Sequence, residues 1–202
     1  MSEPANSRQE AHAGLVAKVD AFHTEVEGRR GAELACRRGC DACCRVRLSV
    51  SAVEAAAIER HIATLDETVR RRLKERVDVA EQDRTTESSP DEPPRCIMLE
   101  DDGACAVYAV RPLVCRTQGL PLRYPPRTFP EDAVMAKGAD GSDIVWCPLN
   151  FKDAPPKGPD VLEAGRLDEM LVLINLEHVG GDREAALKRV SLEMLVEQMS
   201  TT

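Results

Sequence analysis

Apolar side chains recur at steps of three and four residues near the start of the chain. This spacing is typical of a helix that buries one face, and it predicts a helix over residues 8–35. The apolar residues that show this spacing are Leu15, Val16, Val19, Phe22 and Val26.

The next helix has a clear start signal. Ser51, with Glu54 three residues later, forms a capping-box pattern directly before AVEAAAIERHIATL. The preceding RVRLSV is read as a short extended piece, and the arginine-rich stretch from Asp66 to about Arg84 as a further helix. The segment TTESSPDEPP that follows predicts a loop, because its Ser, Pro and acidic residues cannot bury a core.

The second half of the chain mixes turn signals with helical spacing. Two short apolar runs flank Asp101-Asp102-Gly103 in CIMLEDDGACAVY and predict a β-hairpin. Frequent prolines and glycines predict irregular structure over residues 121–159, interrupted by IVWCPLNF. Helical spacing then returns, which predicts helices over residues 162–178 and 183–199, joined by Gly180-Gly181.

Length and composition indicate the number of domains and the fold class. The 202 residues suit a single domain, 1–202, with a cysteine-cluster core over about 36–148 and flanking helical regions over 8–35 and 160–199. Aromatic residues make up only 3%, so the core must come mainly from Leu, Val, Ile and Ala, which favours helices. We therefore expect a mainly α fold: a compact helical domain with a small β-hairpin and irregular Cys-rich loops. The cysteines add the expectation that these loops lie around a metal site.

The charge balance bears on partners and location. A net charge of −8 and a pI near 5.1 argue against general attraction to nucleic acid or to anionic membranes. The N-terminal residues MSEPANSRQEAHAG show no basic region followed by an apolar stretch, so a cytoplasmic protein is expected. A protein partner and the oligomeric state both stay open.

Eight cysteines are many for such a chain. Without a secretion signal, a disulfide framework is the less expected use, and reduced thiols close together are most simply explained as metal ligands. The candidate ligands are Cys36, Cys40, Cys43, Cys44, Cys96, Cys105, Cys115 and Cys147. Two other readings of individual thiols stay open: a small buried hydrophobe, above all for Cys147, and a redox pair formed by Cys40 and Cys43.

The stretch CRRGCDACC limits how its thiols can share a metal. In one continuous helix its four cysteines would face within an arc of about 100°, yet the rise of ~1.5 Å per residue would separate the α-carbons of Cys36 and Cys44 by about 12 Å. Each side chain with a Zn–S bond reaches only about 5 Å. Either Gly39 breaks the helix or the thiols serve two centres. The neighbours Cys43 and Cys44 are expected to point apart, which favours two centres or a polynuclear cluster.

The remaining cysteines complete a larger donor set. Cys96 and Cys105 flank the predicted hairpin, and eight thiols would suffice for two closed four-thiolate sites, which suit zinc and iron–sulfur clusters alike. Positive charge near thiolates would offset their negative charge. The arginines beside or close to cysteines are Arg37, Arg38, Arg45, Arg111 and Arg116, of which Arg111, held before Pro112, is the best candidate.

This ordered pattern resembles the cysteine-cluster family with the CxxxCxxCC motif, described as a zinc- or iron-chelating domain. Besides the first seven cysteines, the matching positions are Gly103, Tyr108, Arg111, Pro112 and Arg116, and Cys147-Pro148 is a plausible last element. The family is similar to the cluster module of flagellin lysine N-methylases. The resemblance implies metal binding through zinc or an iron–sulfur cluster, and it implies no single reaction.

Three functions follow from this pattern. The first is a metal-binding protein whose zinc or iron–sulfur site is structural or redox-active. The second is a cluster-dependent enzyme that uses S-adenosylmethionine, for methyl transfer or radical chemistry. Against it, the chain lacks alternating strands and helices, Ala42 stands where radical motifs commonly carry an aromatic residue, and no GxGxG-like stretch follows a strand. The third is an interaction module folded around zinc. A non-enzymatic role is favoured, and catalytic residues stay unknown.

Overall fold

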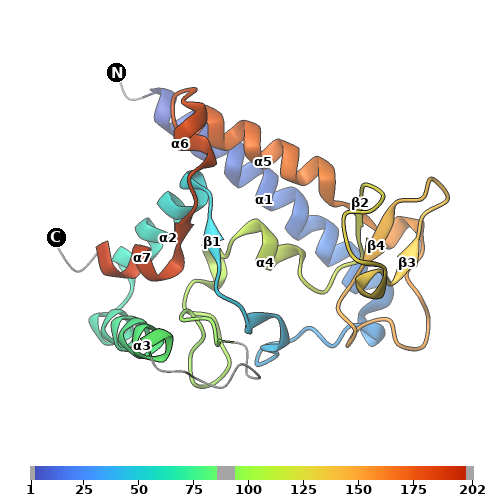
Figure 1. The fold of residues 1–202 in the computed structure, drawn as a ribbon, viewed down its shortest axis with the longest axis horizontal. Helices are drawn as coiled ribbons and strands as arrows, with labels where there is room; N and C mark the ends of the chain where they lie inside the picture. Colours follow the sequence, from blue (N-terminus) through green and yellow to red (C-terminus); the bar gives the residue numbers. More distant parts are fainter. Residues whose placement is uncertain (1–2, 86–93, 199–202) are drawn as a thin grey trace. The chain divides into compact units, whose positions relative to one another are not determined.

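The computed structural model describes residues 3–85 and 94–198. The chain forms two compact units, each built from two separate stretches. Unit 1 comprises Met1–Arg37 and Leu113–Glu177, and unit 2 comprises Arg38–Pro112 and His178–Thr202. The boundary falls inside CRRGCDACC. The fold is mainly α with small strands, as predicted (Figure 1), and the single domain over 1–202 stays a prediction.

Unit 1 contains three α-helices and a small sheet within the described residues. The helices are α1 (Glu3–Arg30), α4 (Leu113–Thr117) and α5 (Ala164–His178). The strands are β2 (Leu122–Tyr124), β3 (Ala136–Lys137), β4 (Asp143–Val145) and β5 (Leu162–Glu163). Their order is β3-β4-β2-β5, with β2 and β5 parallel and the other pairs antiparallel.

The prediction of irregular structure over 121–159 was incomplete. Most of the four-stranded sheet lies in this segment. Each strand is only two or three residues long, too short for an alternating pattern to appear in the sequence. Pairing with strands distant in the chain forms the sheet, for example Leu122 opposite both Val145 and Leu162.

The predicted buried stripe of the first helix is confirmed. Leu15 and Val19 form a cluster with Leu113 of α4, on which α5 packs through Leu167, Leu171 and Ile174. Val26 forms a second cluster with Leu120 and Phe151. The helix ends at Arg30, before the predicted end at residue 35. Arg30 leaves the helical conformation, and its guanidinium donates to Asp160 at 2.8 Å.

Unit 2 contains four α-helices and one strand pair within the described residues. The helices are α2 (Ala52–Thr64), α3 (Glu67–Thr85), α6 (Arg183–Leu187) and α7 (Leu192–Gln198), and the strands are β1 (Ser49–Val50) and β6 (Val190–Ser191). The predicted capping box of α2 is present, with the Ser51 N–H donating to the Glu54 carboxylate at 3.0 Å. The helix predicted from Asp66 is confirmed as α3. The predicted loop TTESSPDEPP lies largely in residues 86–93, outside the described ranges.

The prediction of a single helix over residues 183–199 was wrong. The chain forms α6, then β6, then α7. Val190 pairs antiparallel with Val50 of β1, and the Arg189 guanidinium donates to the Ser49 carbonyl at 2.6 Å. These tertiary bonds to β1 outweigh the helical spacing. The connection between α5 and α6 is as predicted, because Gly180 and Gly181 both have positive φ, at 73° and 85°.

The predicted hairpin is reduced to one antiparallel bridge, between Leu99 and Cys105. The turn itself forms where expected, since the Glu100 N–H donates to the Ala104 carbonyl at 2.7 Å and Gly103 has a φ of +78°. A Cβ on Gly103 would lie 3.0 Å from the Gly39 α-carbon. This turn therefore packs closely against the glycine in the middle of CRRGCDACC.

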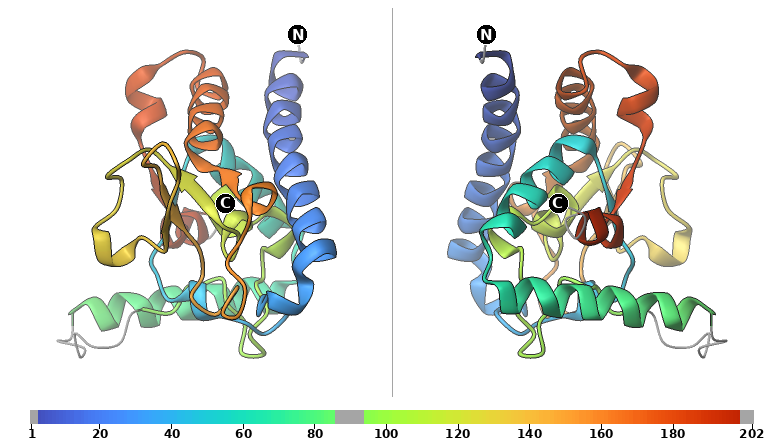
Figure 2. Two further views of the ribbon diagram at one scale, coloured as in Figure 1. Left: turned by 90° about the vertical axis from the view of Figure 1, so that its right-hand side faces the viewer. Right: turned by 90° about the vertical axis from the view of Figure 1, so that its left-hand side faces the viewer.

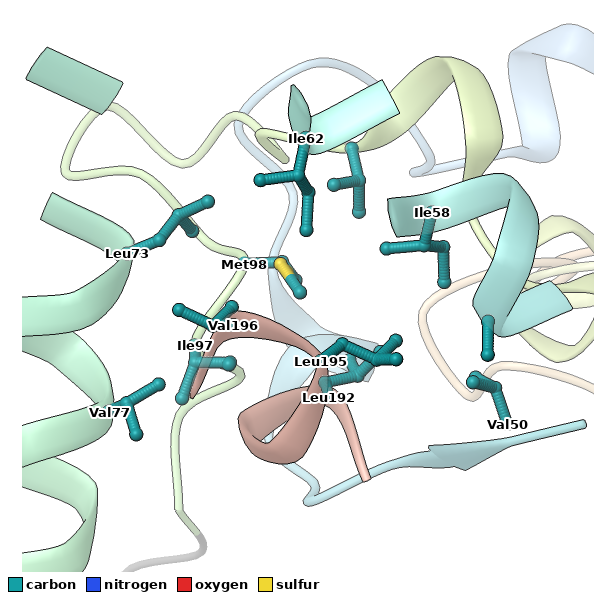
Figure 3. Close-up of a cluster of buried hydrophobic side chains, with 12 residues drawn as sticks. Val50, Ile58, Ile62, Leu73, Val77, Ile97, Met98, Leu192, Leu195 and Val196 are labelled. Atoms are coloured by element: carbon teal, nitrogen blue, oxygen red, sulfur yellow. The ribbon is translucent and has the colours of Figure 1, made fainter. Parts of the chain in front are cut away.

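The core of unit 2 supports the segment that carries Cys96. Figure 3 shows side chains from α2, α3 and α7 gathered around Ile97 and Met98, and Figure 2 shows α7 next to α2 and α3. The labelled members are Val50, Ile58, Ile62, Leu73, Val77, Ile97, Met98, Leu192, Leu195 and Val196, and all are buried. Cys96 and Cys105 pack at the edge of this cluster. The core thus anchors two candidate ligands.

Candidate metal centre

No disulfide joins any of the eight cysteines, all of which lie in the described residues. The two units divide them unequally. Unit 1 carries Cys36, Cys115 and Cys147, and unit 2 carries Cys40, Cys43, Cys44, Cys96 and Cys105. Each unit therefore has its own set of thiols.

CRRGCDACC does not form a continuous helix. Gly39 has a φ of +89°, a left-handed conformation that glycine adopts without steric cost, and the chain turns there. A short 3₁₀-helix, Ala42–Cys44, follows, and the Cys44 N–H donates to the Asp41 carbonyl at 2.8 Å. Of the two alternatives left open by the sequence, the structure shows the break at Gly39, and a division of the thiols between two centres stays open. The constraint that a helix would place on Cys36 and Cys44 is therefore removed.

Backbone hydrogen bonds hold three cysteine-bearing segments of unit 2 together. The Cys96 N–H donates to the Cys44 carbonyl at 2.8 Å, which ties the end of the 3₁₀-helix to the segment that begins at residue 94. The bridge from Leu99 then places Cys105 alongside. Cys43 and Cys44, Cys96 and Cys105 thus come from distant parts of the sequence and meet in one region.

The thiols of this region affect one another's ionisation. A hydrogen bond with the Cys44 side chain, followed by burial, raises the pKa of the Cys43 thiol well above its ordinary value. Burial, and then the negative charges of Cys105, Glu193 and Cys43, raise the pKa of Cys96 to about 11. The expectation that the neighbours Cys43 and Cys44 point apart is wrong, because their side chains lean together and form this hydrogen bond.

Cys105 has a similar environment, moderated by one cation. Its pKa is raised chiefly by burial, while the Arg111 guanidinium acts in the opposite direction. Arg111 stacks on the Tyr108 ring, 4.0 Å from the ring centroid, and donates to the Tyr108 carbonyl at 3.1 Å. The side chain named as the best charge partner therefore lies near a candidate ligand. Two of the other arginines make ion pairs with carboxylates in unit 2, Arg38 with Asp102 and Arg45 with Asp41.

The donor set of unit 2 fits a thiophilic metal. Partial burial and the charges of neighbouring thiolates oppose ionisation of Cys43, Cys96 and Cys105 in the metal-free protein. A bound cation would favour ionisation, because it stabilises every thiolate at once. Sulfur ligands of this kind suit zinc and iron–sulfur clusters. Within residues 3–85 and 94–198, no three Cys, His, Asp or Glu side chains form a group that could hold a metal ion as they stand.

The thiols of unit 1 lie on three different segments. Cys36 follows α1 and its 3₁₀ extension, Cys115 lies in α4, and Cys147 begins a turn in which the Asn150 N–H donates to the Cys147 carbonyl at 2.9 Å. Next to Cys115, the buried Arg116 pairs with Asp20 of α1 at 2.7 Å. This ion pair ties α4 to α1.

Sequence reasoning missed Asn150. Its side chain is buried, and the Nδ2 group lies 3.4 Å from the Cys36 sulfur. A signal was present, because Asn150 is a polar residue between apolar ones in IVWCPLNF and comes three residues after a candidate ligand. A buried amide needs partners, and here one of them is a cysteine.

Comparisons with known proteins support metal binding. Residues 35–133 match the model of the CxxCxxCC family, described as a “putative zinc- or iron-chelating domain”. The matched segment holds every cysteine except Cys147 and confirms the resemblance found in the sequence. Its description fits zinc or iron as alternatives, as expected. No curated protein and no solved structure matches the chain. Among the helices of the described residues, none has the length and apolar character to cross a membrane.

Proposed function

Because the chain carries a CxxCxxCC-family domain over residues 35–133, we propose that this protein holds zinc or an iron–sulfur cluster through a set of cysteine thiolates, in a structural or redox role. The proposal includes all eight cysteines as ligands. It assigns the principal site of unit 2 to Cys43, Cys44, Cys96 and Cys105, with Cys40 beside them on the same loop.

One observation carries the proposal. The bond from the Cys96 N–H to the Cys44 carbonyl and the bridge between Leu99 and Cys105 bring together four thiols from three segments of unit 2, and these thiols affect one another's ionisation. Two of the four, Cys96 and Cys105, pack at the edge of the hydrophobic core. Without a cation this arrangement is unfavourable for thiolates, since burial and mutual repulsion both oppose their ionisation. Four sulfur donors are also the number that closes a tetrahedral zinc site or a cubane cluster.

The chain's own groups have distinct tasks in this site. The core under Ile97 and Met98 fixes the segment that carries Cys96, and the bond from the Cys96 N–H to the Cys44 carbonyl fixes its distance from the vicinal pair. Arg111, held by the Tyr108 ring, offsets thiolate charge near Cys105. When bound, zinc supplies a cross-link between these segments, and an iron–sulfur cluster would add one-electron redox chemistry.

Metal binding would require the thiols of the proposed unit 2 site to rotate towards one shared metal position. Ligand sulfurs lie about 2.3 Å from zinc, so the side chains of Cys43 and Cys44 would exchange their mutual hydrogen bond for bonds to metal. Three protons or more would leave with them. The gain in stability on binding is therefore coupled to pH and to the ordering of the loop over residues 40–44.

The test is metal analysis with a visible spectrum on protein purified without oxygen. An iron–sulfur protein would be brown and would bleach in air, whereas a zinc protein would be colourless and would lose thermal stability with a chelator. Either result at one equivalent or more supports the proposal. Less than one equivalent of any metal overturns it.

Variants identify the ligands. Serine at Cys43, Cys96 or Cys105 should release metal, because each removes one thiolate from the proposed site. A matched control is Ala42→Ser, which adds the same hydroxyl at an exposed position in the same 3₁₀-helix and should keep the metal. Cys44→Ser separates two forms of the site: loss of metal supports a closed four-thiolate set, and retention supports a three-thiolate set.

A further inference from the structure

We infer that Asn150 is a positioning residue for the sulfur of Cys36, to which its side-chain amide donates an N–H···S hydrogen bond. This inference rests on the proposed function, in which Cys36 is a metal ligand. Asn150 lies outside the segment matched by the family model.

The partners of the Asn150 amide fix its orientation. Its Oδ1 accepts a hydrogen bond from the Ala35 N–H at 2.8 Å, so the Nδ2 group must lie on the opposite side. Nδ2 donates to the Gly119 carbonyl at 2.8 Å and approaches the Cys36 sulfur at 3.4 Å. The side chain is only 1% exposed. Both of its N–H groups and its oxygen are therefore used within the protein.

Gly119 confines the same sulfur from a second side. It has a φ of +89°, and a Cβ at this position would lie 2.4 Å from the Cys36 sulfur and 3.1 Å from Asn150 Nδ2. A side chain at residue 119 would thus occupy the space of the sulfur. The backbone after α4 and the Asn150 amide together form a close-fitting seat for Cys36.

This seat has a chemical consequence for a bound metal. An N–H donor stabilises negative charge on a thiolate and reduces the electron density that the sulfur gives to the metal. The same bond restricts the side-chain rotation of Cys36, so Cys36 loses less conformational entropy when a metal binds to its sulfur. Outer-shell partners of this kind typically change metal affinity by about 10–100-fold.

Co²⁺ is a suitable probe, because its thiolate charge-transfer band reports directly on the electron density of the sulfurs. The full chain is titrated with Co²⁺ as wild type, Asn150→Ala, Cys36→Ser and the double variant. The expected result for Asn150→Ala is a loss of about 10–100-fold in affinity at the Co²⁺ site that Cys36→Ser also weakens, with the charge-transfer band of that site moved to lower energy. In the Cys36→Ser background, Asn150→Ala should change neither affinity nor band.

A second measurement needs no variant. In the wild-type protein, the side-chain NH₂ resonances of Asn150 should shift when Zn²⁺ is added, because their acceptor changes from a thiol to a metal-bound thiolate. Unchanged resonances at saturating Zn²⁺ would overturn the inference, even if Asn150→Ala did not fold.

The outcomes separate this inference from the proposed function. If Asn150→Ala weakened binding equally with and without Cys36, the amide would act only on the fold; the inference would fail and the proposed function would stand. If Cys36→Ser bound Co²⁺ like wild type, Cys36 would be no ligand, which also overturns the inference. If the wild type bound neither Co²⁺ nor Zn²⁺, the proposed function itself would fail, and the inference with it.

Discussion

Gly119 offers the sharpest test of the packing around Cys36, through the substitution Gly119→Ala. An alanine with a φ near +89° costs about 1–2 kcal/mol from left-handed strain alone. Its Cβ would lie 2.4 Å from the Cys36 sulfur, whereas non-bonded heavy atoms need about 3.5 Å. The sulfur would have to move by roughly 1 Å, and forcing extra atoms into a packed site costs about 1–3 kcal/mol.

Gly141→Ala is a matched control for the backbone strain. Gly141 lies in the same unit with a φ of +80°, and its Cβ would meet only Pro126 Cγ, at 4.0 Å. We expect this control to lose about 1–2 kcal/mol, and Gly119→Ala to lose about 2–5 kcal/mol. The difference between the two variants measures the contact with Cys36.

Urea unfolding of the metal-free protein, followed by circular dichroism, measures both losses. The same variants are then titrated with Co²⁺, where Gly119→Ala should bind at least about 10-fold more weakly and Gly141→Ala like wild type. The reasoning would be refuted if the two variants were equally stable, within about 0.5 kcal/mol. Wild-type Co²⁺ affinity in Gly119→Ala would equally show that the Cys36 sulfur is not held at this position.

Three further predictions concern stability. In the metal-free protein the pKa of Cys96 is raised from 9.0 to about 11, so the stability that this thiol contributes to the fold is fully present below pH 9 and is lost as the pH rises towards 11. In thermal unfolding, Cys96→Ser should therefore lose less stability than wild type between pH 9 and 11. An equal loss in the two proteins would contradict the raised pKa. Leu195→Ala, at a fully buried site of the unit 2 core, should cost about 2–5 kcal/mol in urea unfolding, and a loss below about 1 kcal/mol would argue against the packing in Figure 3. Asp160→Asn removes the charge that pairs with Arg30 at 2.8 Å; since Asp160 is buried, a loss of about 2 kcal/mol or more is expected from the same assay, and an unchanged midpoint would count against a stabilising pair.

Local signals in the sequence were enough for several elements. The spacing of Leu15, Val19 and Val26 predicted the buried face of α1, because helical periodicity is a property of neighbouring residues. The capping box of Ser51 and Glu54 likewise acts within one turn, and α2 begins where it indicates. For these elements the relevant contacts are close in the chain.

Pairing between distant segments could not be predicted in the same way. β6 forms because Val190 meets Val50, about 140 residues away, and the helix expected there is interrupted. The strands of unit 1 are too short for an alternating pattern, so their existence depends on partners that the local sequence does not reveal.

The candidate site shows the same division. The cysteine spacing by itself determined the class of chemistry and, through the helical rise, that Cys36 and Cys44 could share one ion only with a break at Gly39, because thiol chemistry and helix geometry are local properties. Only the tertiary structure decided which thiols meet: Cys43 and Cys44 with Cys96 and Cys105, and Cys36 with the amide of Asn150. Such meetings depend on how the core and the backbone hydrogen bonds bring distant segments together, which no pattern of neighbouring residues contains.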